Sequence, residues 1–251
     1  MTGVLPVALN EATKVLKVLL EGGKEYVCVM QLHAPAGRDT VERVLGEFQG
    51  EIYQRPPLRA SVKRTLRTRM IYYIHLVEVE ANLVLFKVGC QAGTYVRKLC
   101  FDIGQVLGTG AHMRELRRTR VGPFTEEKSL VSLEALAQAR DEFEEGDPSS
   151  LLRLLQPVED ALAFVPKMVV RDSAVDALCH GADLAVPGIL SLDKEVKVGS
   201  TVAVFTLKGE VIALGRALMS TRDILENEKG LAVKTERVVM KPGTYPRKWG
   251  S

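Results

Sequence analysis

The chain has 251 residues, of which 46% are hydrophobic and 26% are charged, and this composition excludes a disordered chain, a collagen-like fibre and a disulfide scaffold. Its longest purely apolar runs are far shorter than the ~20 residues of a membrane-spanning helix, and its first residues lack the charged-then-apolar order of a signal peptide. The four cysteines form no CxxC pair and the four histidines are dispersed. We therefore expect buried, reduced thiols in an intracellular protein, and no metal site.

Basic residues are concentrated although the net charge is only +3. Residues 55–69 contain six basic side chains and no acidic one, whereas residues 114–120 contain four arginines and one glutamate. Residues 141–147 are instead strongly acidic. Two basic segments in a nearly neutral chain indicate a face that binds a polyanion. The alternative, that both segments are ordinary solvated faces, stays open on charge alone.

The first half of the chain alternates between helical and strand patterns. Apolar residues spaced by three and four predict helices, and runs rich in β-branched and aromatic residues predict strands. In chain order we expect a helix over 11–20, a strand over 26–32, a helix over 40–48, a hairpin of 71–79 and 83–90, a helix over 95–107 and a strand over 115–121. Between the second helix and the hairpin, Pro56-Pro57 predicts an extended loop.

The second half changes character after two more predicted helices, over 132–143 and 151–162. In the second of them, Pro157 must begin a new turn or kink the helix. Pro166-Lys167 is the predicted domain boundary. Beyond it we expect a short helix over 172–180, closed by Gly181, and then short strands with turn signals roughly every ten residues, a spacing typical of a small β-barrel. The fold class is therefore α+β, with domains over 1–166 and 167–251.

Candidate chemistry lies in four short segments, each with an ordinary structural interpretation. Gly93-Thr94-Tyr95 before a helix is typical of a tight turn with a packed aromatic, and Tyr26 is typical of the first inward residue of a strand. An arginine-rich strand can be an edge that positive charge protects from pairing. The segments are Lys24-Glu25-Tyr26, Arg55-Pro56-Pro57, Gly93-Thr94-Tyr95-Val96-Arg97 and the stretch from Gly110 to Gly122.

In this order and at these spacings, the segments resemble the TruB/dyskerin family of RNA pseudouridine synthases, and the resemblance runs from Thr2 to Trp249. Residues 2–9 resemble the stretch after the family's catalytic loop. Residues 172–175, 181–188 and 244–250 resemble the PUA domain and chain end of the dyskerin branch, closest to its archaeal proteins. The resemblance implies a mixed β-sheet synthase domain with flanking helices, incomplete at its N-terminus, and a PUA RNA-binding barrel.

The implied reaction isomerises uridine to pseudouridine without a cofactor. The target uridine is flipped out of its RNA, an aspartate acts first, either by attacking the sugar or as a base, the glycosidic bond is cleaved, and the uracil is rejoined through C5. Tyr26 would stack against the flipped base, which needs a π-face to replace its lost stacking, and would assist removal of the C5 proton. Arg97 would pair with the catalytic carboxylate and keep it ionised, and Leu116 would form an apolar wall of the uracil pocket.

The resemblance also implies RNA contacts and partners. Basic side chains would meet phosphates and contribute affinity without sequence choice: Arg55, Lys63, Arg64, Arg67, Arg117 and Arg118 in the first domain, and Lys241, Arg247 and Lys248 in the second. The implied partners are an H/ACA guide RNA, a substrate rRNA or tRNA, a small zinc-bearing protein, a small β-barrel protein and a kink-turn-binding protein, with no membrane. The implied location is cytoplasmic for an archaeal-type protein and nucleolar for a eukaryotic one.

The sequence departs from the family at the aspartate. The family's Gly-Thr-Leu-Asp-Pro-like loop lies a few residues before the position of Thr2, and Asp39, Asp102 and Asp160 match no such context. We therefore expect the chain as given not to isomerise uridine alone, and we favour a sequence that starts too late over an internal start codon or a separate upstream piece. Two alternatives stay open: a non-catalytic RNA-binding scaffold, and a stand-alone tRNA pseudouridine synthase.

Overall fold

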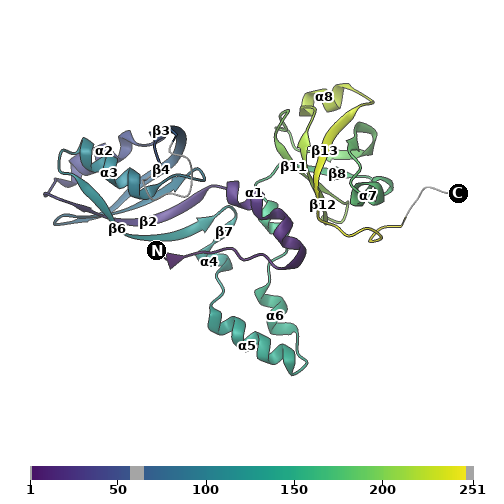
Figure 1. Ribbon diagram of the computed structural model, residues 1–251, viewed down its shortest axis with the longest axis horizontal. Coiled ribbons are helices and arrows are strands. Elements are labelled where there is room, and N and C mark those ends of the chain that lie inside the picture. Colours follow the sequence, from purple (N-terminus) through teal and green to yellow (C-terminus); the bar gives the residue numbers. More distant parts are fainter. Residues whose placement is uncertain (1, 57–64, 247–251) are drawn as a thin grey trace. The chain divides into compact units, whose positions relative to one another are not determined.

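The computed structural model describes residues 2–56 and 65–246. The chain divides into two compact units, one formed by residues 1–6 and 20–138 and the other by residues 7–19 and 139–251. Each unit is built around its own β-sheet (Figure 1). The predicted boundary at Pro166-Lys167 lies directly before the first strand of the second sheet.

The first sheet, within the described residues, has seven strands in the order β1-β6-β2-β5-β4-β3, with β7 paired to β6. All neighbouring strands are antiparallel except β1 and β6, which are parallel. The strands are β1 (Thr2–Gly3), β2 (Lys24–Leu32), β3 (Gly50–Gln54), β4 (Arg67–Glu80), β5 (Leu83–Cys90), β6 (Ala111–Val121) and β7 (Phe124–Thr125). The predicted hairpin is confirmed, and its turn is Ala81-Asn82.

Two helices, α2 (Arg38–Glu47) and α3 (Val96–Val106), lie on one face of this sheet (Figure 1). The strand β2 shows the resulting alternation, because successive strand residues point to opposite faces. Its even-numbered residues from Tyr26 to Leu32 are buried in the core, and its odd-numbered residues from Glu25 to Gln31 are half-buried on the other face. We call these the helix-covered face and the outer face.

The packing between α3 and β6 depends on a glycine. A Cβ atom at Gly104 would lie 2.2 Å from the backbone nitrogen of Ala111, a distance that real Cβ atoms do not tolerate. The helix then ends before Gly108, whose φ of +72° is readily available only to glycine. The helix predicted over 95–107 is therefore confirmed within one residue at each end.

Several short helices accompany the sheets. A 3₁₀ turn (Asn10–Val15) leads into α1 (Leu16–Glu21), where one helix over 11–20 was predicted. The others in the first half and linker are α4 (Glu126–Ser129), α5 (Leu133–Glu144), α6 (Ser149–Leu154) and a 3₁₀ turn (Asp160–Leu162). The helical pattern predicted over 151–162 is interrupted, since α6 ends at Leu154 and a new 3₁₀ turn begins at Asp160; of the two outcomes predicted at Pro157, the new turn is the one observed. The helix stops at Leu154 because Pro157 lacks an N–H and disfavours a helical conformation of the residue before it.

The second sheet has the order β10-β8-β11-β12-β13-β9 among the described residues. Its strands are β8 (Lys167–Val170), β9 (Leu184–Ala185), β10 (Ile189–Leu192), β11 (Thr201–Phe205), β12 (Val211–Ala217) and β13 (Leu231–Val238). The pair β8–β11 is parallel and the other pairs are antiparallel. These short strands match the predicted small β-rich domain, and they enclose a core that includes Met168, Val204 and Ile212.

The helices after Lys167, among the described residues, are α7 (Asp172–Cys179), a 3₁₀ turn (Val186–Gly188) and α8 (Thr221–Glu226). The predicted helix over 172–180 and its closing glycine are confirmed, since Gly181 has a φ of +88°. The cysteines are buried and free, as predicted. In the described part of the chain, no helix is long and apolar enough to span a membrane.

Candidate functional site

Tyr26 lies in the middle of the first sheet, on the helix-covered face. In the register of the sheet it is opposite Val88 of β5 and Arg118 of β6. Its side chain is 9% exposed, and this burial raises the pKa of the Tyr26 phenol, although a hydrogen bond and the positive charge from Arg118 act in the other direction. At neutral pH the ring is therefore an uncharged surface held from one side by a guanidinium.

Arg118 connects Tyr26 to the first residues of the chain. Its Nε donates a hydrogen bond to the Val4 carbonyl at 2.7 Å, and the Val4 N–H donates to the Arg118 carbonyl at 2.8 Å. The strand β1 runs parallel to β6 at this point, with Gly3 opposite Arg118. Gly3 has a φ of +99°, and a Cβ there would lie 2.1 Å from the Arg118 carbonyl oxygen. Only glycine therefore lets the segment lie this close to β6.

Leu116 shares the helix-covered face with Tyr26. It is opposite Cys28 in the register, so it is the diagonal neighbour of Tyr26 across the β2–β6 pair, a separation of roughly 7–8 Å between backbones. Leu116 is half-buried and packs at the border of the core that contains Tyr26. The structure thus brings the predicted stacking ring and the predicted apolar wall onto the same surface.

Arg97 lies in the first turn of α3, one of the helices on that face. The helix start is fixed by Gln54, which is 2% exposed: its Nε2 donates to the Tyr95 carbonyl at 3.3 Å, and its Oε1 accepts the Tyr95 N–H at 3.0 Å. The Arg97 side chain is exposed. Among residues 2–56 and 65–246 it has no ion-pair partner, so its guanidinium is available to an anion.

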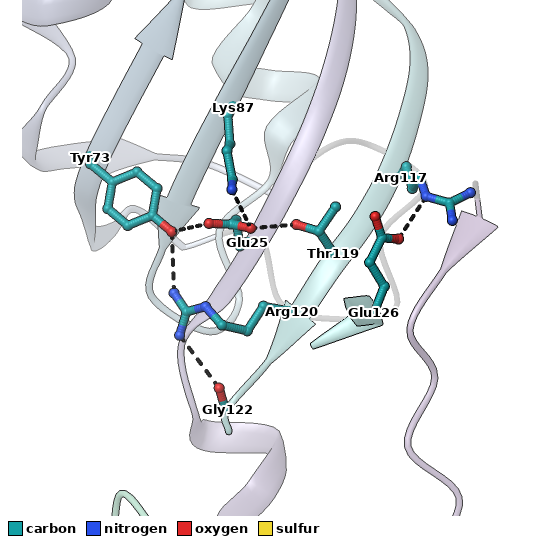
Figure 2. A network of polar contacts seen from close by, with 8 residues as sticks. All are labelled: Glu25, Tyr73, Lys87, Arg117, Thr119, Arg120, Gly122 and Glu126. Carbon is teal, nitrogen blue, oxygen red and sulfur yellow. Dashed lines mark hydrogen bonds and ion pairs between the residues drawn. The ribbon is translucent and has the colours of Figure 1, made fainter. Parts of the chain in front are cut away.

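The outer face of β2 carries a polar network directly behind this surface (Figure 2). The Glu25 carboxylate accepts hydrogen bonds from Thr119 Oγ1 at 2.7 Å and from the Tyr73 hydroxyl, and pairs with Lys87 Nζ at 3.1 Å. Arg120 reaches the Tyr73 hydroxyl at 3.4 Å. We call these five residues the Glu25 network.

The Glu25 network keeps its carboxylate charged. Burial acts to raise the pKa of Glu25, whose side chain is 13% exposed, but the hydrogen bonds from Thr119, Tyr73 and Lys87 outweigh it and the pKa is lowered. The members come from β2, β4, β5 and β6, so one carboxylate ties these strands together at the position of Tyr26. The partners of Glu25 could not be predicted from the sequence, because only the strand register shows which residues lie beside it.

The predicted RNA-contacting residues are distributed over several elements. Arg117 lies on the outer face, where its side chain is 51% exposed and its Nε is 2.8 Å from Glu126 Oε2 (Figure 2). Arg55 is exposed directly after β3, and Arg67 begins β4 with its Nε 3.5 Å from Thr65 Oγ1. In the second unit, Lys241 is exposed after β13. Arg118 lies beside Tyr26 as described above, and the remaining predicted contacts lie outside the described residues: Lys63, Arg64, Arg247 and Lys248.

The described residues hold no candidate metal site, and the two histidines that lie near the site contact each other. In the parts of the chain described, no group of three or more His, Cys, Asp or Glu side chains could hold a metal ion. His112, next to the arginine-rich strand segment, contacts His33, with 2.9 Å between Nδ1 and Nε2. The two exposed imidazoles share one hydrogen bond, and neither lies on the helix-covered face, since His112 is opposite Gln31.

Family models match most of the chain. Residues 166–239 match a model described as PUA domain. Residues 97–163 match one described as tRNA pseudouridylate synthase B C-terminal domain, and residues 4–117 match one described as Pus10, C-terminal. The first match begins at the predicted domain boundary, and both of the others include Arg97. The second covers all of β6, whereas the third covers β6 only as far as Arg117.

Relatives with similar sequences carry the name probable tRNA pseudouridine synthase B. The protein from Methanopyrus kandleri is 52% identical over 100% of this chain and 74% of its own length. The protein from Methanocaldococcus jannaschii is 54% identical over 99% of this chain and 74% of its own length.

The fold is also similar to chains of two solved complexes. A chain of a Cbf5-Nop10-Gar1 complex superposes with a TM-score of 0.94 at 51% identity, covering 97% of this chain and 74% of that one. A chain of an H/ACA RNP bound to a substrate RNA containing 2′-deoxyuridine gives a TM-score of 0.91 at 48% identity, covering 98% of this chain and 75% of that one. Both similarities extend over the whole fold described above.

Proposed function

The chain belongs to the TruB/Cbf5 family of pseudouridine synthases, which are isomerases, and we propose that its helix-covered face at Tyr26 holds the target uracil in an H/ACA guide-RNA particle. The observation that carries the proposal is the arrangement of that face. An uncharged aromatic ring and an apolar side chain lie side by side on the sheet, and the first turn of α3 presents an arginine without an ion-pair partner among the described residues.

Each of these residues has a task in the proposal. Tyr26 stacks on the flipped uracil, which loses its neighbours when it leaves the RNA helix. Burial raises the pKa of the Tyr26 phenol, so the ring that stacks on the uracil is uncharged, and its hydroxyl would assist removal of the C5 proton. Leu116 closes the apolar side of the pocket. Arg97 pairs with the attacking carboxylate, holding it ionised and oriented through a charge-assisted hydrogen bond.

The aspartate in this proposal comes from the family's Asp-containing loop and not from the residues given. Asp39 and Asp102 lie in α2 and α3, and Asp160 lies in a 3₁₀ turn. Asp102 is moreover paired with Lys98. We therefore propose that these 251 residues alone bind RNA without isomerising it, and that activity requires the loop.

Guide dependence is supported by similarity. The solved Cbf5 chains are found with Nop10 and Gar1 and, in an H/ACA RNP, with a substrate RNA. By analogy we propose that this chain works with a guide RNA and with small zinc-bearing, β-barrel and kink-turn-binding proteins, on rRNA or tRNA. The PUA-matching unit, with exposed Lys241, would grip the guide RNA.

The proposal is tested by adding the loop. We define the extended protein as this chain preceded by an upstream segment with the family's Asp-containing loop. Pseudouridine in a guide-paired substrate RNA is measured by mass spectrometry. We expect product with the extended protein and guide RNA, and none with the 251 residues alone. If the extended protein binds the guide RNA but forms no pseudouridine, the chain is the RNA-binding scaffold. Product without guide RNA would favour a stand-alone tRNA enzyme.

A further inference from the structure

Two neighbouring arginines of β6 point in opposite directions. Because strand residues alternate between faces, Arg117, opposite Val27, lies on the outer face, and Arg118, opposite Tyr26, lies on the helix-covered face. Charge and spacing in the sequence made both arginines equal candidates for contacts with RNA phosphates. Their surroundings in the fold are different.

Arg117 has the surroundings of a phosphate contact. Its side chain is half exposed, and its partner Glu126 is itself partly exposed. An exposed ion pair of this kind is weak, since water and salt screen it. Replacing the Glu126 carboxylate by an RNA phosphate would therefore cost Arg117 little free energy.

The side chain of Arg118 is instead used in contacts within the protein. It is half-buried, it is the cross-strand partner of Tyr26 in the register of β2 with β6, and its Nε donates to the Val4 carbonyl at 2.7 Å. Its own backbone carbonyl accepts the Val4 N–H. A guanidinium holds its N–H donors in a fixed plane, so these contacts fix the position of the phenol relative to the segment Gly3-Val4.

We propose that Arg118 is a positioning residue for Tyr26: it lies between the Tyr26 ring and the segment Gly3-Val4, links the two, and thereby sets the plane on which the uracil stacks. This inference rests on the proposed function of Tyr26. Stacking depends on the orientation of the ring, which the apolar neighbours of the core set on one side and Arg118 sets on the other. Binding a phosphate would take the guanidinium away from these contacts, so Arg118 contributes to the rate of the reaction and not to RNA affinity.

The direct test follows Tyr26 itself in the 251-residue chain. Tyrosines are labelled with ¹³C at Cζ, the Tyr26 resonance is assigned with Tyr26→Phe, and its chemical shift is followed against pH by NMR. Arg118→Gln is expected to displace the resonance and to move its titration to higher pH, because a positive charge and a hydrogen bond are lost. Arg117→Gln, its matched control, leaves the resonance in place. An unchanged Tyr26 resonance and titration in Arg118→Gln would overturn the proposal.

A second variant covers the case in which Arg118→Gln does not fold. Arg118→Lys keeps the positive charge but loses the planar set of donors. It is expected to displace the Tyr26 resonance while shifting its titration less than Arg118→Gln does. A Lys variant with the wild-type spectrum would contradict the proposal equally, because charge alone would then suffice.

The functional test uses single-turnover kinetics with the extended protein and guide RNA. Arg118→Gln is expected to lower the rate at saturating RNA by roughly tenfold to a hundredfold, as a small misplacement of a reacting group does, with little change in the Kd for RNA. Arg117→Gln shows weaker RNA binding and a smaller salt dependence. If Arg118→Gln instead weakens binding and flattens the salt dependence at a wild-type rate, Arg118 is a phosphate contact. If the unmutated extended protein is inactive, the proposed function fails, and the NMR experiment still decides whether Arg118 positions Tyr26.

Discussion

The two faces of the first sheet differ at adjacent residues of the same strand. On the outer face, the Glu25 carboxylate accepts hydrogen bonds from residues of neighbouring strands and pairs with Lys87. On the helix-covered face, Tyr26 rests on apolar neighbours and one guanidinium, and Arg97 at the start of α3 is exposed. Polar groups that bond to one another, as in the Glu25 network, hold the strands of the sheet together. Groups without such partners can contact a ligand, and we propose this for Tyr26 and Arg97.

The largest effect is expected from removing the charge on the site face. In the extended protein, Arg97→Ala should lower turnover by roughly 10²- to 10³-fold, the usual effect of removing one group that stabilises charge during the reaction. RNA affinity should be largely retained. Arg97→Lys, which keeps the charge but not the bidentate geometry, should be intermediate. Single-turnover rates and RNA binding are measured together, and full activity in the Ala variant would remove Arg97 from the site.

On the outer face the expected effect is on stability. Glu25→Gln should destabilise the first unit by about 1.5–3 kcal/mol, the range for hydrogen bonds to a charged group. Because folding lowers the pKa of Glu25, its contribution is fully present above the unfolded pKa of about 4.3 and is lost as the pH falls through the lower folded value. Urea unfolding at pH 7 and below pH 4 measures this.

The control for that change is Glu126→Gln, which removes the same charge from the more exposed pair with Arg117. Its effect should stay below about 1 kcal/mol, as for other surface ion pairs. Equal losses in the two variants, or a Glu25→Gln effect that does not depend on pH, would show that the Glu25 network does not hold the strands.

A local effect is expected where β1 meets β6. Gly3→Ala places a Cβ against the Arg118 carbonyl at a positive φ, a conformation that costs about 1–3 kcal/mol for other residues. Hydrogen exchange at the Val4 amide should therefore become faster. Gly46→Ala is the matched control, because that helical glycine has nothing within 4 Å of a built Cβ, and it should stabilise α2 by about 0.5–1 kcal/mol. Unchanged exchange at Val4 would mean that β1 does not depend on this close approach.

The smallest effect is expected for Arg117. In the extended protein, Arg117→Gln should reduce the slope of log K against log salt by about one, the value for one phosphate contact. RNA binding measured between low and moderate salt gives this slope. A slope identical to that of the unmutated protein would place Arg117 away from the RNA.

The sequence predicted elements that carry local signals better than elements that depend on pairing with distant strands. The hairpin turn at Ala81-Asn82 and the end of α3 before Gly108 follow from local signals and are confirmed. The strands β3 and β8 were not predicted, because short strands owe their conformation to pairing with distant partners. The helix α8 was also missed, although Ser220 and Asp223 form a capping box that the sequence does display.

The residues of the site can be named from sequence motifs, whereas the face of the sheet on which each one lies follows only from the fold. Tyr26 and Leu116 could be named from the motifs, but their common face depends on the register of β2 with β6, which shifts next to Glu25 and again next to Met30. A shift of one residue moves a side chain to the opposite face. For this reason the partners of Glu25 and the different surroundings of Arg117 and Arg118 could not be derived from spacing alone.

The central claim is that Tyr26 supplies the surface on which the target uracil stacks. Its most direct test is the single-turnover rate of pseudouridine formation by the extended protein with Tyr26→Phe and Tyr26→Leu, at saturating guide and substrate RNA. We predict that Tyr26→Phe, which keeps the ring, retains much more activity than Tyr26→Leu, because loss of base stacking on an aromatic costs about 1–3 kcal/mol. Equal rates for the Leu variant and the unmutated protein would contradict the account.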